Sequence, residues 1–372
     1  MKTIFHSLIL FSFILIFAAC EKEIKFNNKL IAPKLVINSF VSADSLFEAT
    51  IALSKAVPGV EKPFEWIDNA TVNLYANGEK VEELKAIEIN YAEDDDNYYW
   101  DDNSNTRPKT KYLSINTKAE AGKTYKLEVI HPEHGTAYGE TTLPQPIEII
   151  SLKSEKTLMN YEWGGKDNQL IVKMKFKDTP NEENYYRLTF TRMYGSSETY
   201  KYDETEKDTS QFTIYISTRK NGTNLNSSDP IFSNDEDAND FLFGSPGNYY
   251  NLFTDDLIDG KEYEISFIAF NKFVDEYSLD TMYNFLEAPG EFCKIDVKLS
   301  SLTREAFLYI KSSHAQDWYG EDFFSEPVQA FSNIENGIGI FAGYSSSVKS
   351  LTIGNYPIDT IRYELNEFDY YY

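Results

Sequence analysis

The chain has 372 residues and a formal net charge of −24, and aromatic residues make up 15% of it. This excess of acid argues against binding to nucleic acid or to anionic lipid through charge, because both need clusters of basic residues. The aromatic content is ample for a folded core, which excludes global disorder, and the length suits two domains.

The first predicted element is a cleaved leader. The apolar run from Leu8 to Ala19 is 12 residues long and is broken only by Ser12. A spanning helix needs about 20 apolar residues, whereas a run of this length fits the core of a signal peptide. The run ends in Phe17-Ala-Ala-Cys20, which resembles the bacterial lipobox. We therefore expect a lipoprotein signal peptide over 1–19, with an ordinary signal peptide and a chance cysteine as the alternative.

Cys20 is the predicted lipidation site and the first mature residue, followed by a tether over 20–30. Two or three acyl chains, with about 0.8 kcal/mol for each buried CH₂, anchor a protein effectively permanently. Glu21 and Glu23 follow at once. Acidic residues at this place resemble the export signal that sends Bacteroidota lipoproteins to the cell surface. The expected location is the outer membrane, lipid-anchored and exposed to the outside.

Short alternating strands dominate the first half of the mature chain. They are expected at 35–40, 47–53, 70–75, 79–84, 111–117, 124–131 and 137–143. Asn77-Gly78 lies between two of them and predicts a type I′ hairpin, whose two central residues need positive φ. Pro144 and Pro146 mark a boundary, because proline cannot continue a sheet ladder. We expect an N-terminal β-sandwich over 31–145.

The second half is expected to form another sandwich over 146–360, followed by a tail over 361–372. Its strands are expected at 147–152, 170–176, 185–194, 212–218, 337–341 and 350–353, with a long polar insertion at 219–248. The apolar spacing from Leu302 to Ile310 is helical. It predicts one short helix near 302–315, with Ser301 as its N-cap.

One phrase occurs twice in the chain. Gly122-Lys-Thr-Tyr125 is echoed by Gly260-Lys-Glu-Tyr263, and in each copy an alternating strand follows. A glycine turn that leads to a tyrosine at the start of a strand is typical of the tyrosine corner of immunoglobulin-like sandwiches. The predicted fold is therefore mainly all-β, with two tandem immunoglobulin-like or carboxypeptidase-regulatory-like β-sandwich domains.

The segment 324–343 carries the most distinctive motif. Phe324-Ser-Glu-Pro-Val328 and Ser332-Asn-Ile-Glu-Asn-Gly-Ile-Gly-Ile-Phe-Ala-Gly343 resemble the C-terminal signature of a Bacteroidota lipoprotein family known as domain of unknown function four-two-four-nine. Further likeness at Pro33–Asn38, Asn69–Tyr75 and Phe253–Gly260 extends the resemblance over nearly the whole mature chain. It implies an outer-membrane lipoprotein whose gene often neighbours that of a TonB-dependent receptor, and it implies no catalytic residue.

Glycines at 337, 339 and 343 recur within this motif. Glycine in a strand allows bulges and the close approach of another backbone. We interpret the three as a packing motif near the helix, with a binding loop as the alternative.

No motif in the sequence supports catalysis, a cofactor or a metal. His131-Pro-Glu-His134 pairs two imidazoles, but Pro132 makes the segment a turn and no third ligand follows from the spacing. Asp235, Asp237 and Asn239 alternate like early calcium ligands, yet the glycine and glutamate of an EF-hand are missing. Both are interpreted as solvated turns or loops, with calcium in the acidic loop left open.

Cys293 lies in an alternating stretch and is expected to be a buried apolar residue rather than a nucleophile. With Cys20 lipidated, it has no partner for a disulfide.

Aromatic clusters are the remaining candidates for ligand binding. Tyr98, Tyr99 and Trp100 form one cluster, and Tyr249 and Tyr250 form another. Aromatic rings on loops offer flat contact area for sugars, peptides or a partner protein. The alternative is tyrosines packed at strand edges.

The sequence thus predicts a protein that is not an enzyme. We expect a surface binding lipoprotein, an accessory to a TonB-dependent receptor in the capture of an unknown nutrient. A structural or adhesive surface lipoprotein is the alternative. A hydrolase with an unrecognised carboxylate pair ranks last.

Overall fold

The computed structural model describes residues 32–54, 65–89, 108–160, 166–205, 208–222, 225–232, 248, 250–274, 292–320, 329–354 and 363–366. All elements described below belong to one compact unit, Lys34–Ser54 with Glu61–Tyr372. The strands of the first half are β1 (Leu35–Ser42), β2 (Leu46–Leu53), β3 (Thr71–Ala76), β4 (Glu79–Glu88), β5 (Thr110–Lys118), β6 (Thr124–His131) and β7 (Gly135–Thr142).

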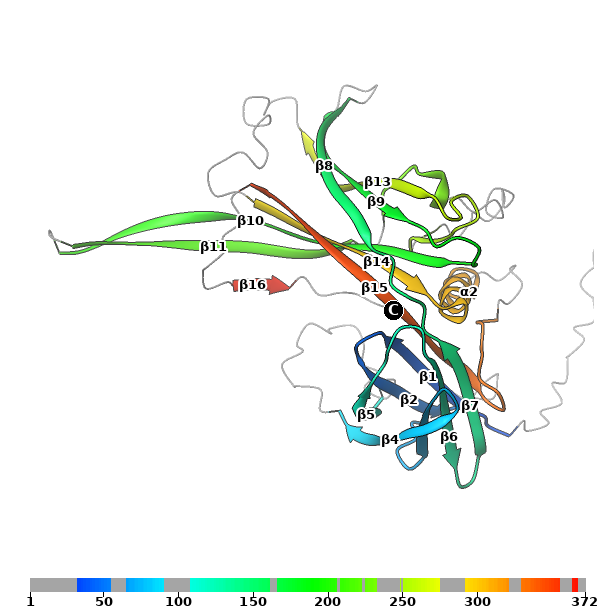
Figure 1. Cartoon of the computed structure of the whole chain (residues 1–372). Helices are drawn as coiled ribbons and strands as arrows, with labels where there is room; N and C mark the ends of the chain where they lie inside the picture. Colours follow the sequence, from blue (N-terminus) through cyan, green and yellow to red (C-terminus); the bar gives the residue numbers. More distant parts are fainter. Residues whose placement is uncertain are drawn as a thin grey trace, which may run out of the picture. The chain divides into compact units, whose positions relative to one another are not determined.

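The second half adds further strands and one α-helix among the described residues (Figure 1). They are β8 (Ile149–Asn160), β9 (Lys166–Lys177), β10 (Tyr185–Thr205), β11 (Asp208–Gly222), the 3₁₀ turn η1 (Pro230–Phe232), β12 (Leu252–Thr254), β13 (Glu262–Val274), β14 (Phe292–Leu302), α2 (Arg304–Gly320), β15 (Ile338–Gly354) and β16 (Tyr363–Asn366). The predicted class, mainly β with sandwich-like sheets and one helix, is confirmed.

Two hydrophobic clusters organise the strands. The first is built mainly from inward residues of β1 to β7, where Phe47 of β2 meets Tyr125 of β6 with ring centroids 4.8 Å apart. The second lies between the sheet β13-β9-β8 and strands β10 and β14, with Phe190 and Phe267 in contact across it. Cys293 is part of this second cluster, and burial raises the pKa of its thiol to about 11. The expectation of a buried, structural cysteine is confirmed.

β15 connects the two clusters. Residues 338–344 pair in parallel with β1, and residues 344–354 pair antiparallel with β14. The sequence predicted two short strands here, whereas one continuous strand of 17 residues is present. A single strand can serve both clusters because its two ends pair with different neighbours, and hydrophobic patterning alone does not show where pairing changes.

The glycines of the distinctive motif allow β1 to approach β15. A Cβ on Gly339, whose φ is +108°, would lie 2.1 Å from the carbonyl oxygen of Ile37. A Cβ on Gly343 would lie 2.8 Å from the carbonyl oxygen of Val41. Side chains at these two positions would push the parallel pair apart. The packing interpretation of the glycine motif is therefore confirmed.

The hairpin between β3 and β4 has the predicted turn. Asn77 and Gly78 both have positive φ, at 50° and 86°. This pair of values is what a type I′ turn requires.

The helix begins later and ends later than the sequence predicted. Thr303 is its N-cap, because its Oγ1 accepts the N–H of Ala306 at 3.1 Å and its carbonyl accepts the N–H of Phe307. Ser301, the predicted cap, is instead paired with Tyr186 and Ser345 in the sheet. The ladder of β14 continues through Leu302, so the helix can start only after it.

α2 packs on the face of the sheet opposite the second cluster. Its Ala306 joins a small third cluster with Leu302, Ile340 and Ala342. Phe307 meets Tyr185 of β10 with ring centroids 5.0 Å apart. None of the helices in the described part of the chain is long and apolar enough to cross a membrane.

Candidate functional site

Most of the sequence-predicted site residues lie outside the described part of the chain. Cys20, Tyr98, Tyr99, Trp100 and Tyr249 belong to these, as do the acidic residues 235–239. Their predictions stay predictions.

Tyr250 is described, and it is half-buried against the third cluster. Its ring meets His314 edge-on at 5.2 Å, and the guanidinium of Arg187 lies 5.5 Å from the ring centroid. Its carbonyl oxygen accepts the Nε–H of Arg187 at 3.2 Å. Tyr250 therefore fixes the orientation of the Arg187 guanidinium.

The histidine pair forms the predicted turn between strands. His131 Nδ1 accepts the N–H groups of Glu133 and His134, at 3.2 and 3.3 Å. Its Nε2 lies 3.0 Å from Asn69 Oδ1, and an Nε2–H donor completes this pattern. Both ring nitrogens of His131 are engaged, so neither offers a lone pair to a metal ion.

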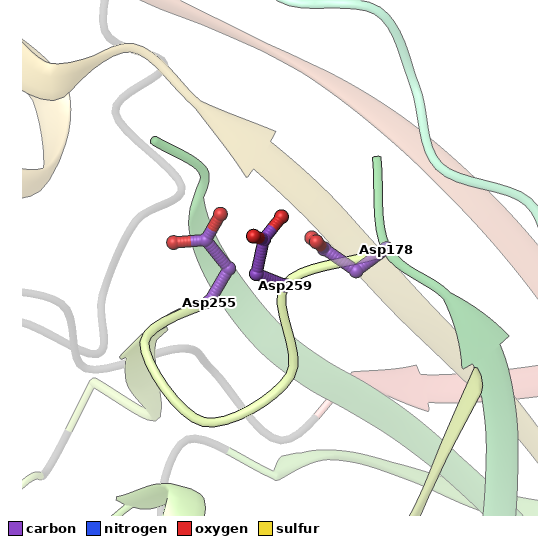
Figure 2. Close-up of side chains that lie close together, drawn as sticks. All are labelled: Asp178, Asp255 and Asp259. Carbon is purple, nitrogen blue, oxygen red and sulfur yellow. The ribbon is translucent and has the colours of Figure 1, made fainter. Parts of the chain in front are cut away.

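The described residues contain one group of acidic side chains close enough to share a cation, and sequence reasoning missed it. Asp178 follows β9, while Asp255 and Asp259 lie in the turn between β12 and β13 (Figure 2). One carboxylate oxygen of each lies within 4.8 Å of the others. Asp178 and Asp255 are 2% and 7% exposed, and Asp259 is exposed.

Hydrogen-bond donors hold these carboxylates in place. Asp178 Oδ1 accepts the hydroxyl of Tyr186 at 2.5 Å, and its Oδ2 accepts the N–H of Gly260 at 2.8 Å. Asp255 Oδ2 accepts two donors from Asn184, the backbone N–H and the side-chain Nδ2–H, each at 3.1 Å. Both carboxylate oxygens of Asp178 thus accept hydrogen bonds, and they connect the end of β9 to β10 and to the turn before β13.

The third carboxylate is held more lightly. Asp259 Oδ1 accepts the N–H of Asn181 at 2.9 Å.

Burial, together with the nearby charge of Asp178, raises the pKa of Asp255, although its bonds from Asn184 act in the opposite direction. Three convergent oxygens are the kind of ligand that calcium prefers. The same donors also explain the cluster as a purely structural turn.

The sequence held only a partial signal for this cluster. Asp255 and Asp259 stand within Phe253-Thr-Asp-Asp-Leu-Ile-Asp-Gly260, which resemblance to the family singled out. Asp178 is remote in sequence, and only the pairing of β9 with β13 brings it to the same turn.

The fold and the side chains together define a mainly β protein whose described residues show no recognised catalytic motif. The chain belongs to the family described as Domain of unknown function (DUF4249), whose model matches residues 21–350. No curated protein matches the chain.

Two solved structures give weak matches. A biofilm-associated protein B domain aligns at 8% identity with a TM-score of 0.16, covering 84% of this chain and 85% of that one. A biofilm-associated protein BSP domain aligns at 7% identity with a TM-score of 0.15, covering 85% of this chain and 58% of that one. Scores this low carry no argument about fold or function.

Proposed function

We propose that the protein is a lipid-anchored binding protein of the outer membrane, exposed at the cell surface, which acts as an accessory to a TonB-dependent receptor in nutrient capture. The observation that carries the proposal is the apolar run that ends in Phe17-Ala-Ala-Cys20. The family model begins at residue 21, directly after this cysteine, which agrees with a leader that is separate from the folded body.

Two side chains of types that often act in catalysis have structural roles in the described part of the chain. The thiol of Cys293 is buried in the second cluster, and the ring nitrogens of His131 are both engaged. The acidic balance favours a soluble body held outside the cell, where its charge attracts cations and basic ligands.

Two cysteine variants test the anchor. Cys20→Ala removes the proposed acylation site, whereas Cys293→Ala removes the other thiol and leaves the leader intact. We expect Cys20→Ala to lose the diacylglycerol mass in intact-protein mass spectrometry and to leave the detergent phase, while Cys293→Ala keeps both. A wild-type protein with an unmodified thiol, free in the culture medium, would refute the proposal.

The receptor association needs its own test. After extraction in mild detergent, tagged wild-type protein should co-purify with a TonB-dependent receptor, and a deletion strain should grow poorly on one nutrient. A structural or adhesive role is the second candidate, because a β-sandwich fold suits that role equally well. Normal growth together with lost attachment would favour it.

A further inference from the structure

A cavity of about 340 Å³ lies beneath α2, on the face of the sheet opposite the second cluster. It is separate from the aspartate cluster and contains none of its residues. Sites for small molecules usually measure about 300–1,000 Å³. The volume therefore suits a small ligand, and the chemistry of the lining indicates which kind.

The floor of the cavity is polar and cationic. Arg187 and Thr189 come from β10, and Lys298 and Ser300 come from β14. Arg187 pairs with Ser300, and Thr189 pairs with Lys298, in the ladder between the two strands. Directly paired side chains stand about 5 Å apart. Two cations and two hydroxyls thus form a compact square that points to one side of the sheet.

The two cations are held in place by aromatic rings. Arg187 donates its Nε–H to the carbonyl of Tyr250 and lies beside that ring. The ammonium of Lys298 lies 4.9 Å from the ring centroid of Tyr344. Within the described part of the chain, no carboxylate comes within ion-pair distance of Lys298, whereas Lys294 on the same strand pairs with Asp296 at 3.1 Å.

The walls of the cavity are apolar. Tyr309 and Ile310 come from α2, and Phe40 comes from β1. Phe40 is 38% exposed and meets Tyr309 with ring centroids 5.6 Å apart. An exposed aromatic ring next to a cationic floor gives the cavity two kinds of surface, one for an apolar body and one for a negative group.

The contrast with a neighbouring hollow shows that this character is local. A hollow of about 460 Å³ on the other side of Leu302 is lined by Glu140, Glu183 and Glu305, and Arg304 is the one cation that the described residues contribute to it. Among the described residues, the lining of this cavity holds two cations and no acid, although the chain has a net charge of −24. Lys298 is half-buried and has no acid within ion-pair distance among the described residues, so a negative group in the cavity would supply its counter-charge.

We infer that the cavity beneath α2 binds a small organic carboxylate with an apolar, ring-sized body. The carboxylate lies against Lys298, with the charge of Arg187 and the hydroxyl of Thr189 beside it, and the apolar body packs on Tyr309, Ile310 and Phe40. This inference rests on the proposed role as a binding protein, but it depends on neither the lipid anchor nor the receptor.

Calorimetric titration of the full-length mature protein in mild detergent tests the inference, with phenylacetate as the anionic probe and phenylacetamide as its uncharged isostere. We expect saturable binding of phenylacetate and at least about tenfold weaker binding of phenylacetamide, because a charge-assisted hydrogen bond is lost. Lys298→Met should weaken phenylacetate binding about tenfold and leave phenylacetamide unchanged, and Lys298→Arg should restore most of the affinity.

Lys294→Met is the matched control, because it removes the same charge from the same strand. It should change phenylacetate affinity less than about twofold. The inference is overturned if phenylacetate does not bind saturably, if the amide binds as well as the acid, or if both methionine variants weaken binding alike. Thermal unfolding of each variant checks that the variant keeps its fold. A wild-type protein that is not acylated at Cys20 but still binds phenylacetate would refute the proposed anchor and leave the cavity assignment standing.

Discussion

The two copies of the Gly-Lys-x-Tyr phrase share a backbone and differ in what their side chains and N–H groups contact. Gly122 and Gly260 both have positive φ. In each copy the lysine N–H donates to a carbonyl three residues earlier, and the lysine carbonyl accepts from a neighbouring segment, at Leu143 in the first copy and Asp178 in the second. The local sequence therefore gives the same turn twice.

The difference begins at the glycine N–H. In the first copy Gly122 donates to the backbone carbonyl of Leu143, and in the second copy Gly260 donates to the carboxylate of Asp178. The tyrosines differ in the same way. The hydroxyl of Tyr125 accepts the backbone N–H of Glu120 at 2.9 Å, a tyrosine corner, whereas that of Tyr263 donates to the carboxylate of Asp229 at 2.8 Å. The first turn is closed by backbone groups and the second by acidic side chains.

The largest effect is expected at Asp178, whose carboxylate accepts in the second copy the glycine N–H that the carbonyl of Leu143 accepts in the first. Asp178→Ala leaves the buried hydroxyl of Tyr186 and the N–H of Gly260 without their acceptor, and each unsatisfied donor costs about 1–3 kcal/mol. We expect a loss of about 4 kcal/mol in the free energy of unfolding, measured by urea titration.

Asp259→Ala is the control for this prediction, because Asp259 lies in the same turn but is exposed and accepts one N–H. It should cost less than about 1 kcal/mol. Equal losses for Asp178→Ala and Asp259→Ala would show that Asp178 is not the clamp of the second turn.

The two glycines should respond unequally to alanine. A Cβ on Gly122 would lie 2.6 Å from the Nε2 of Gln145, a flexible side chain that can move, so Gly122→Ala should cost about 1 kcal/mol for the left-handed backbone alone. A Cβ on Gly260 would lie 2.8 Å from the Cβ of the rigid Pro180. Gly260→Ala should therefore cost about 2–3 kcal/mol. Urea titration of both variants measures the difference, and a larger loss at Gly122 would contradict it.

These two turns also show which features of the structure could be predicted from the sequence. The repeated phrase, the Asn77-Gly78 hairpin and the alternating strands were predictable because each depends on neighbours along the chain. The predicted corner is correct at Tyr125 and wrong at Tyr263, because Asp229 comes from a segment 34 residues away. Asp178, the N-cap at Thr303 and the continuous β15 were missed for the same reason, since tertiary pairing decides each of them.

Double-mutant cycles sharpen the difference between the tyrosines. In the second copy, Tyr263→Phe and Asp229→Ala remove two side chains that bond to each other, so we expect a coupling energy of about 0.5–1 kcal/mol. In the first copy, Tyr125 bonds to the backbone of Glu120, so Tyr125→Phe and Glu120→Ala should be additive within about 0.5 kcal/mol. Unfolding free energies of the wild type and of the three variants in each cycle, seven proteins in all, give both values. Coupling of similar size in both copies would show that the side chain of Glu120 also contributes.

The smallest expected effect is on the pH dependence of the second copy. Burial and the hydrogen bond to Asp229 raise the pKa of Tyr263 to about 12, from 10.0 for an unperturbed tyrosine. Between these two pH values the folded state holds its phenolic proton while the unfolded state has released it. More protons bound in the folded state mean that stability falls as pH rises, and it falls until the folded group also ionises.

Tyr263→Phe removes this contribution, so its free energy of unfolding should decline less steeply than that of the wild type from pH 10 to pH 12. The near-ultraviolet absorbance of tyrosinate in the wild type minus that in Tyr263→Phe should titrate near pH 12. A difference that titrates near pH 10 instead would mean that the bond between Tyr263 and Asp229 does not hold the proton.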